Sequence, residues 1–84
     1  MPTLADFYGI SIRMYLRGRD HNPPHIHAKY GEYTASISIV TGEIIDGEIP
    51  LRALQLVREW LNENRDKLMK VWETQAFERI PPLN

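Results

Sequence analysis

The sequence predicts an α+β fold, in which an antiparallel meander of three to four strands has one face covered by one or two C-terminal helices, in the order β-β-β-(β)-α-α. Two observations support this fold. Apolar and polar residues alternate through residues 10–40, with turn signals between the runs, whereas apolar residues recur at helical spacing after Pro50. With 84 residues, 43% of them hydrophobic and 25% charged, the chain is expected to form a single globular domain, 1–84.

Residues 10–17 are predicted to form the first strand, because apolar and polar residues alternate there and so leave opposite faces. The apolar set is Ile10, Ile12, Met14 and Leu16, and the polar set is Ser11, Arg13, Tyr15 and Arg17. Residues 1–9 show no clear period and are expected to cap one edge of the core. Residues 18–24 are expected to be a loop, because Pro23-Pro24 favours an extended chain and disfavours helix before it.

Residues 25–30 and 33–40 flank Gly31-Glu32, and a glycine at the first central position suits a type II′ hairpin turn. The turn fixes a register with an apolar and a polar side. The apolar pairs are Tyr30 with Tyr33, Ala28 with Ala35 and Ile26 with Ile37, and the polar pairs are Lys29 with Thr34, His27 with Ser36 and His25 with Ser38. A short fourth strand at 43–45 is expected to end at Asp46-Gly47.

Pro50 suits the first turn of a helix, where its missing N–H costs nothing. An apolar stripe follows, and it contains Leu54, Val57, Trp60, Leu61, Leu68, Val71 and Trp72. Because Asn64 interrupts the stripe, we expect one helix to about Asn62 and a second, or a kinked continuation, from Arg65 to about Phe77. Both tryptophans are expected in the core. A helix-turn-helix that binds DNA is an alternative, which acidic residues of the second helix disfavour.

The charge balance excludes a general attraction to nucleic acid or to an anionic membrane, because the net charge is -1. Between residues 10 and 31, however, four basic residues face one acidic residue: Arg13, Arg17, Arg19 and Lys29 against Asp20. The absence of cysteine excludes thiolate metal sites and suits a reducing compartment. No apolar run is long enough to span a membrane, so we expect a cytoplasmic protein that does not bind membranes.

All three histidines lie in the run Asp20-His21-Asn22-Pro23-Pro24-His25-Ile26-His27. Side chains two apart on a strand leave the same face, so His25 and His27 could converge on one metal ion. His21 could add a third ligand and Asp20 a fourth or an orienting group, which suits zinc or another divalent transition metal. A metal-dependent hydrolase is one reading of this run.

A second reading needs no metal. The polar side of the predicted sheet would be open, and there His25 and His27 could act as general base and acid. Arg13, Arg17 and Lys29 would hold a phosphate, and Tyr15 could stack on a base. This set suits a ribonuclease-like enzyme that cleaves RNA through its own 2′-hydroxyl. A third, non-enzymatic reading is that Asp20 and Asn22 hydrogen-bond the loop and that the histidines are solvated residues of a binding module.

The chain resembles a family of small bacterial proteins catalogued as domain of unknown function 4160. The shared residues are Met1-Pro2-Thr3, Phe7-Tyr8-Gly9-Ile10, Asp20-His21-Asn22-Pro23-Pro24-His25 with His27, Tyr30-Gly31-Glu32-Tyr33, Pro50, Arg52-Ala53-Leu54 and Glu59-Trp60. The segment Arg17-Gly18-Arg19 is more basic than the family's turn. The resemblance implies no activity, but members of the family are often encoded beside a second small protein in pairs that look like toxin–antitoxin modules.

From the residues and the resemblance together, the leading hypothesis is a component of a toxin–antitoxin-like pair, more as effector than as neutraliser, that acts on RNA or through a bound metal. The expected partner is a small protein encoded by a neighbouring gene. The alternative is a regulator, or a module that binds protein, RNA or DNA, in which the histidine run is structural.

Overall fold

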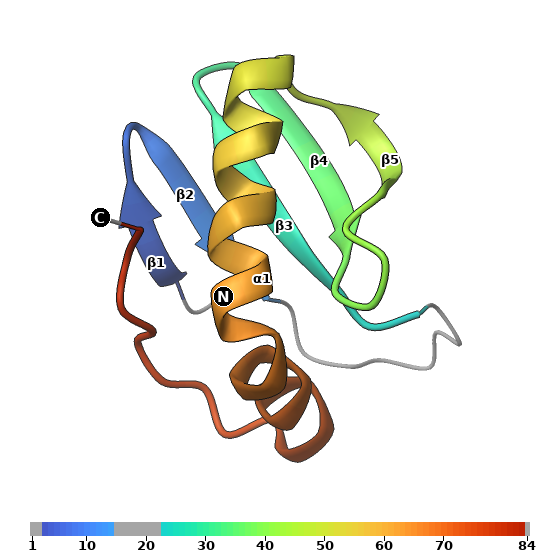
Figure 1. Cartoon of the computed structure of the whole chain (residues 1–84), viewed down its shortest axis with the longest axis vertical. Coiled ribbons are helices and arrows are strands. Elements are labelled where there is room, and N and C mark those ends of the chain that lie inside the picture. Colours follow the sequence, from blue (N-terminus) through green and yellow to red (C-terminus); the bar gives the residue numbers. More distant parts are fainter. Residues whose placement is uncertain (1–2, 15–22, 84) are drawn as a thin grey trace.

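The computed structural model describes residues 3–14 and 23–83 and shows a five-stranded antiparallel sheet packed against one helix (Figure 1). The strands follow one another in space in the order of the chain, β1-β2-β3-β4-β5. The elements are β1 (Thr3–Phe7), β2 (Ile10–Arg13), β3 (His25–Tyr30), β4 (Tyr33–Ser38), β5 (Ile44–Glu48) and α1 (Leu51–Thr74). The α+β class and the meander are therefore confirmed, with one strand more than the sequence predicted.

The register predicted for the β3–β4 hairpin is confirmed at all six pairs, from His25 opposite Ser38 to Tyr30 opposite Tyr33. Gly31 has φ +60, as the first central residue of a type II′ turn requires. Because the register is the predicted one, alternate residues of the hairpin face α1 and pack in the core. These are Ile26, Ala28, Ala35 and Ile37, each at most 1% exposed.

Two strand predictions were wrong, and the strand predicted at 33–40 ends at Ser38, because the chain turns there toward β5. Residues 3–7 form β1, although we expected them only to cap the core, and a bulge between Thr3 and Ala5 interrupts their alternation. The strand β5 runs to Glu48 through Asp46-Gly47, where we expected it to end. Gly47 lies directly beside β4, at φ +82, and a Cβ added to it would collide with the carbonyl oxygen of Thr34. This glycine permits close pairing of the strands, so it does not break the strand.

The C-terminal helical region is one helix with a kink, which confirms the predicted kinked continuation and rejects two separate helices. Asn64 has non-helical φ and ψ of -123° and 16°, and its side-chain amide donates to the carbonyl of Trp60. The helix ends at Thr74, earlier than the predicted Phe77, because Gln75 takes a left-handed conformation and its N–H closes onto the carbonyl of Val71. None of the described helical sequence is long and apolar enough to cross a lipid bilayer.

Two arginines of α1 fasten the helix to the loop that joins β4 to β5. Arg58 Nε donates to the carbonyl of Gly42 at 2.7 Å, and Arg65 Nε donates to the carbonyl of Ile39 at 2.8 Å. Both arginines are half-buried. Because an arginine has several N–H donors, each can satisfy a loop carbonyl while its charge stays near water.

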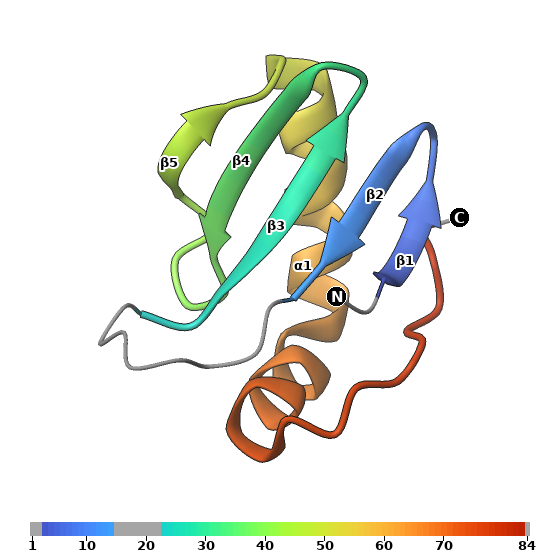
Figure 2. The ribbon, with the colours of Figure 1, turned by 180° about the vertical axis from the view of Figure 1, so that it is seen from behind.

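The C-terminal tail crosses back to β1, as Figure 2 shows from behind. Its backbone pairs with the outer edge of that strand, because the N–H of Ile80 donates to the carbonyl of Leu4 at 2.8 Å. Trp60 is fully buried, as predicted, and its indole N–H donates to the carbonyl of Pro81 at 2.8 Å. The tail therefore closes the core at the β1 side of the sheet.

Candidate functional site

The helix covers one face of the sheet, as Figure 2 shows from behind. In the described part of the chain, the strand register places polar side chains in rows across the other face. We call this surface the histidine face. Its central row contains Arg13, His27, Ser36 and Asp46, which pair in turn from β2 to β5. The row on one side contains His25 and Ser38, and the row on the other contains Ser11, Lys29, Thr34 and Glu48.

His25 and His27 lie side by side on this face, as their spacing predicted. Their ring centroids are 4.9 Å apart, with the rings nearly edge to face at 69°. Both residues are half-buried, whereas Ile26 between them is fully buried under α1. The alternation of a single strand therefore brings two imidazoles together on the face away from Ile26, with Nε2 of His27 itself buried.

The Pro-Pro step orients the first of these imidazoles. The carbonyl of Pro24 accepts the N–H of Ile39 at 2.9 Å, which ties the start of β3 to the end of β4. The adjacent carbonyl of Pro23 lies 2.9 Å from His25 Nδ1. Because a carbonyl only accepts, Nδ1 carries the proton, and neutral His25 has its lone pair on Nε2. That tautomer can accept a proton or bind a metal ion through Nε2.

His27 sits deeper in the same face. Its Nδ1 is 3.3 Å from the hydroxyl oxygen of Ser36, which lies directly opposite on β4. Burial, and then the nearby charge of His25 when that ring is protonated, lower the pKa of His27 below its usual 6.5. His27 therefore stays neutral at a pH where an ordinary histidine has already bound a proton, which is the state a general base needs.

Two cations flank the histidines. Arg13 pairs across the strands with His27, and Lys29 is the next residue of β3 on the same face. The Nε of Arg13 is buried without a hydrogen-bond partner among the described residues, and Lys29 is exposed. A buried guanidinium donor without a partner is costly, so an acceptor such as a phosphate or carboxylate oxygen bound there would be stabilised.

Trp72 packs against the core, as the sequence suggested, and it also borders the site. It is half-buried, and its ring centroid lies 5.2 Å from that of His25. The apolar spacing of α1 could not reveal this contact, because the contact depends on the direction that the helix takes after the kink at Asn64. Trp72 restricts the positions open to the His25 ring.

The remaining site predictions fall outside the described residues. Tyr15, Arg17, Asp20 and His21 all lie in the segment 15–22, so the predicted metal set cannot be assembled from residues 3–14 and 23–83 alone. Within those two ranges no group of three or more histidine, cysteine, aspartate or glutamate side chains could hold a metal ion. His25 and His27 are the two members of the metal set that the structure describes, and they lie together.

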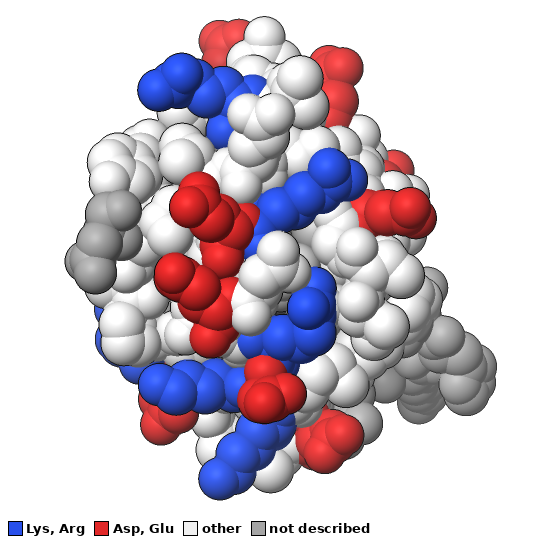
Figure 3. All heavy atoms as spheres, in the orientation of Figure 1, with Lys and Arg blue, Asp and Glu red and all other residues white. Residues whose placement is uncertain are grey.

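Among residues 3–14 and 23–83, the basic side chains of the histidine face lie on β2 and β3. The same rows end on acidic residues, with Asp46 and Glu48 on β5 and Asp6 on β1. On the helix-covered side, acidic and basic side chains are mixed along α1 (Figure 3). Within the part of the chain that the structure describes, neither distribution provides the long basic surface that a protein needs to follow many phosphates.

Comparison with known families identifies the chain. The model of the family described as Domain of unknown function (DUF4160) matches residues 9–73, so the chain belongs to that family. No curated protein and no solved structure matches the chain significantly. The match covers β2 to β5 and nearly all of α1, and it includes every described residue of the histidine face except the acidic end on β1.

Proposed function

We propose that this member of the DUF4160 family is the effector of a toxin–antitoxin-like pair and cleaves single-stranded RNA at its histidine face. The observation that carries the proposal is the contact of two imidazoles, 4.9 Å apart, in unequal surroundings. Burial favours the neutral form of His27, whereas His25 keeps its Nδ1–H bonded to a carbonyl, which leaves Nε2 as its second nitrogen for proton transfer. Unequal surroundings suit a base and an acid that work on one phosphate.

In the proposed reaction, His27 removes the proton from a ribose 2′-hydroxyl, and the oxygen attacks the adjacent phosphorus. The bond from phosphorus to the 5′-oxygen breaks, and protonated His25 gives its Nε2 proton to that oxygen. The products are a 2′,3′-cyclic phosphate and a 5′-hydroxyl. Arg13 and Lys29 would balance the charge that builds up on the phosphate oxygens. Tyr15 and Arg17 are further proposed contacts to the RNA.

The distribution of charge on the histidine face supports the binding of a short stretch of RNA. The described basic residues of the histidine face lie on β2 and β3; acidic residues end their rows on β5, and Asp6 ends the row of Lys29 on β1. An extended RNA would meet those acidic residues, so we expect the enzyme to hold one or two phosphates and to show a weak dependence on salt. Short, flexible RNA should be cleaved more readily than duplex.

A short fluorescent single-stranded RNA tests the proposal directly. We expect cleavage that ends in a cyclic phosphate, and no cleavage where a 2′-deoxynucleotide replaces the reacting ribose. His27→Ala and His25→Ala should each lower the rate about 10²- to 10⁴-fold, the usual contribution of one proton-transfer group. The rate should rise with pH through the lowered pKa of His27.

Thr34→Ala is the matched control, since Thr34 is an exposed residue of the same face on the neighbouring strand. It should retain the activity of the unchanged protein. Activity that persists in both histidine variants, with their folds verified by circular dichroism, would overturn the enzymatic proposal. Cleavage of the deoxy-substituted strand would show that the 2′-hydroxyl is not the nucleophile.

One observation favours a metal-binding function as the second candidate. The bond from His25 Nδ1 to a backbone carbonyl is the arrangement that metal-bound histidines usually adopt. Zinc or another divalent transition metal would then bind His25 and His27, with His21 and Asp20 completing the set. Protein purified without a histidine tag should contain about one metal ion per chain, and chelation should abolish activity. Less than about a tenth of an equivalent would reject this candidate.

The partner is part of the proposal. A small protein encoded by the neighbouring gene would mask the histidine face and act in the cytoplasm, in keeping with a chain that contains no cysteine. Expression of the chain alone should arrest bacterial growth, and His27→Ala should relieve the arrest. If the histidine variants arrest growth as strongly as the unchanged chain, the face is a binding surface and the protein is a non-enzymatic regulator.

A further inference from the structure

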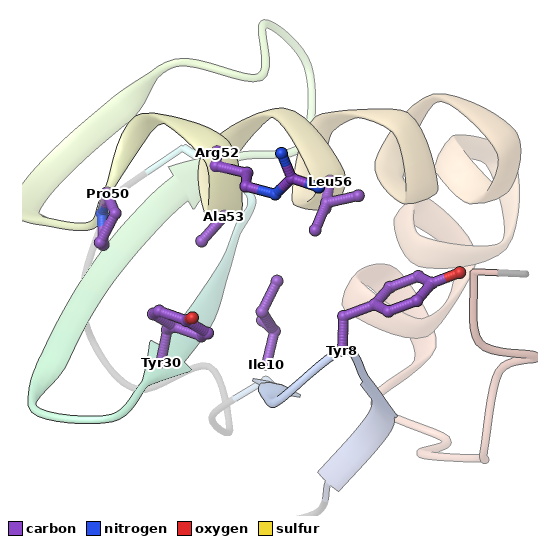
Figure 4. A pocket seen from close by; sticks show the side chains of 7 residues that line it. All are labelled: Tyr8, Ile10, Tyr30, Pro50, Arg52, Ala53 and Leu56. Atoms are coloured by element: carbon purple, nitrogen blue, oxygen red, sulfur yellow. The ribbon is translucent and has the colours of Figure 1, made fainter.

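A pocket of about 580 Å³ lies on the other side of the sheet from the histidines, where the first turns of α1 pass over β2 and β3. Figure 4 shows Ile10 and Tyr30 pointing from the strands toward Ala53 and Leu56 of the helix, with Tyr8 at one side and Arg52 along the rim. The lining is mainly aliphatic and aromatic with a single charged group, the composition of most binding pockets.

Tyr8 is held at the pocket in an unfavourable backbone conformation. Its φ is +49, and Gly9 follows at +80, so the two residues form the centre of the turn between β1 and β2. Asparagine, aspartate or glycine usually fills the place that Tyr8 takes. Core packing does not explain the tyrosine, because its side chain is 60% exposed. Such an outlier points to a function for the exposed ring.

The apolar surface continues beyond the mouth of the pocket. Tyr33 lies directly opposite Tyr30 in the hairpin and is 45% exposed, and Leu51 precedes Arg52 and is 66% exposed. With Tyr8 and Tyr30 they account for four of the six most exposed large apolar side chains among the described residues. A pocket inside a wider patch of tyrosine and leucine is typical of a surface that binds protein rather than an isolated small molecule.

Arg52 indicates that a group bound at the pocket carries a negative charge. It is exposed at the rim and makes no ion pair within the part of the chain that the structure describes. No acidic residue lines the pocket or occupies the first turn of α1. We propose that this patch is a docking site for a partner protein, which inserts an aromatic or leucine side chain into the pocket and pairs an adjacent carboxylate with Arg52.

A random peptide library panned on the full chain tests this proposal without a known partner. Enriched peptides should combine an aromatic residue or leucine with aspartate or glutamate. Their affinity should fall at least about 10-fold in Arg52→Glu and in Tyr30→Ala, as expected for loss of an anchor or of its paired charge. Lys70→Glu is the matched control, because it makes the same change of charge at an exposed position of the same helix. It should change the affinity less than about twofold.

Three results would overturn the proposal. One is a panning experiment in which no related peptides are enriched. Another is a set of enriched peptides that bind Arg52→Glu as well as they bind the unchanged protein. The third is a change in the NMR signals of Ile10 and Tyr30 when phenylacetate is added but not when any of the peptides is added. That result would assign the pocket to small aromatic acids. Because the patch and the histidine face lie on opposite faces of the sheet, His27→Ala should leave peptide binding unchanged.

Discussion

The two faces of β3 obey different physical rules, although their residues alternate along one strand. Ile26 and Ala28 are fully buried beneath α1, while His25 and His27 lie half-buried on the face without the helix. On the covered face, the shape and volume of a side chain determine which substitutions the protein tolerates. On the histidine face, the capacity of a side chain to bind protons and form hydrogen bonds determines which substitutions are tolerated. Neighbouring substitutions should therefore separate stability from activity more cleanly than distant ones.

The largest effect is expected when an imidazole is moved to the wrong face. Ala28→His would force a larger polar ring into the packed core, and we expect a loss of more than about 4 kcal/mol in the free energy of unfolding. Urea unfolding followed by tryptophan fluorescence measures it. Lys29→His, at the next and exposed position, should change stability by less than about 0.5 kcal/mol. Equal midpoints for the two variants would refute the contrast between the faces.

A smaller loss is expected where α1 is tied to the sheet. Arg65→Met removes the donor that satisfies the carbonyl of Ile39, so we expect a loss of about 1–3 kcal/mol. The exposed Lys67→Met, two residues away, serves as the control and should be nearly neutral. The comparison uses the same urea unfolding experiment. A neutral Arg65→Met would show that water replaces the arginine at no cost.

On the histidine face, stability should depend on pH. Because the folded state lowers the pKa of His27, the unfolded chain binds more protons just below pH 6.5. Stability is therefore highest above that pH, and it falls as the pH drops from 6.5 toward the lowered pKa. His27→Gln should reduce this dependence, as measured by thermal unfolding at several pH values. Parallel curves for the variant and the unchanged protein would exclude His27 as its source.

The smallest expected effect is spectroscopic. The ring centroids of His25 and Trp72 lie 5.2 Å apart, so removal of the imidazole should let solvent reach the indole and shift the emission of Trp72 slightly to longer wavelength. Trp60 is buried away from solvent and should contribute a constant background. His25→Ala should show this shift, whereas Thr34→Ala, at an exposed position of the same face, should not. Identical emission spectra for His25→Ala and the unchanged protein would contradict the contact.

The sequence predicted the part of the fold in which the alternation of apolar residues and the position of a turn indicate the same strands. The β3–β4 register followed from two clean alternations around Gly31, and it placed His25 and His27 on the correct face. The strand β1 was missed because its bulge puts Leu4 and Ala5 both in the core, which removes the alternation. The end of β5 was misplaced for a similar reason, because a bulge interrupts the alternation and Gly47 is a residue typical of strand ends.

The sequence predicted only those features of the site that follow from the alternation of side chains along single strands. Alternation placed Arg13, His27 and Ser36 on one surface, but the proximity of Trp72 depends on the path of α1 after Asn64. The roles of Arg58 and Arg65 were also hidden, because their carbonyl partners lie in a distant loop. The pocket at the start of α1 gave no sequence signal, since it forms only when Tyr8, Tyr30 and Arg52 come together from three elements.

The tail that runs along β1 makes the two borders of the sheet unequal. Ile80 already uses a backbone carbonyl of β1, and Arg79 lies 3.3 Å from the carboxylate of Asp6 on the same strand. The strand β5 is the last of the sheet, with its residues largely exposed. An extended segment of another chain would therefore add to the sheet beside β5 and not beside β1.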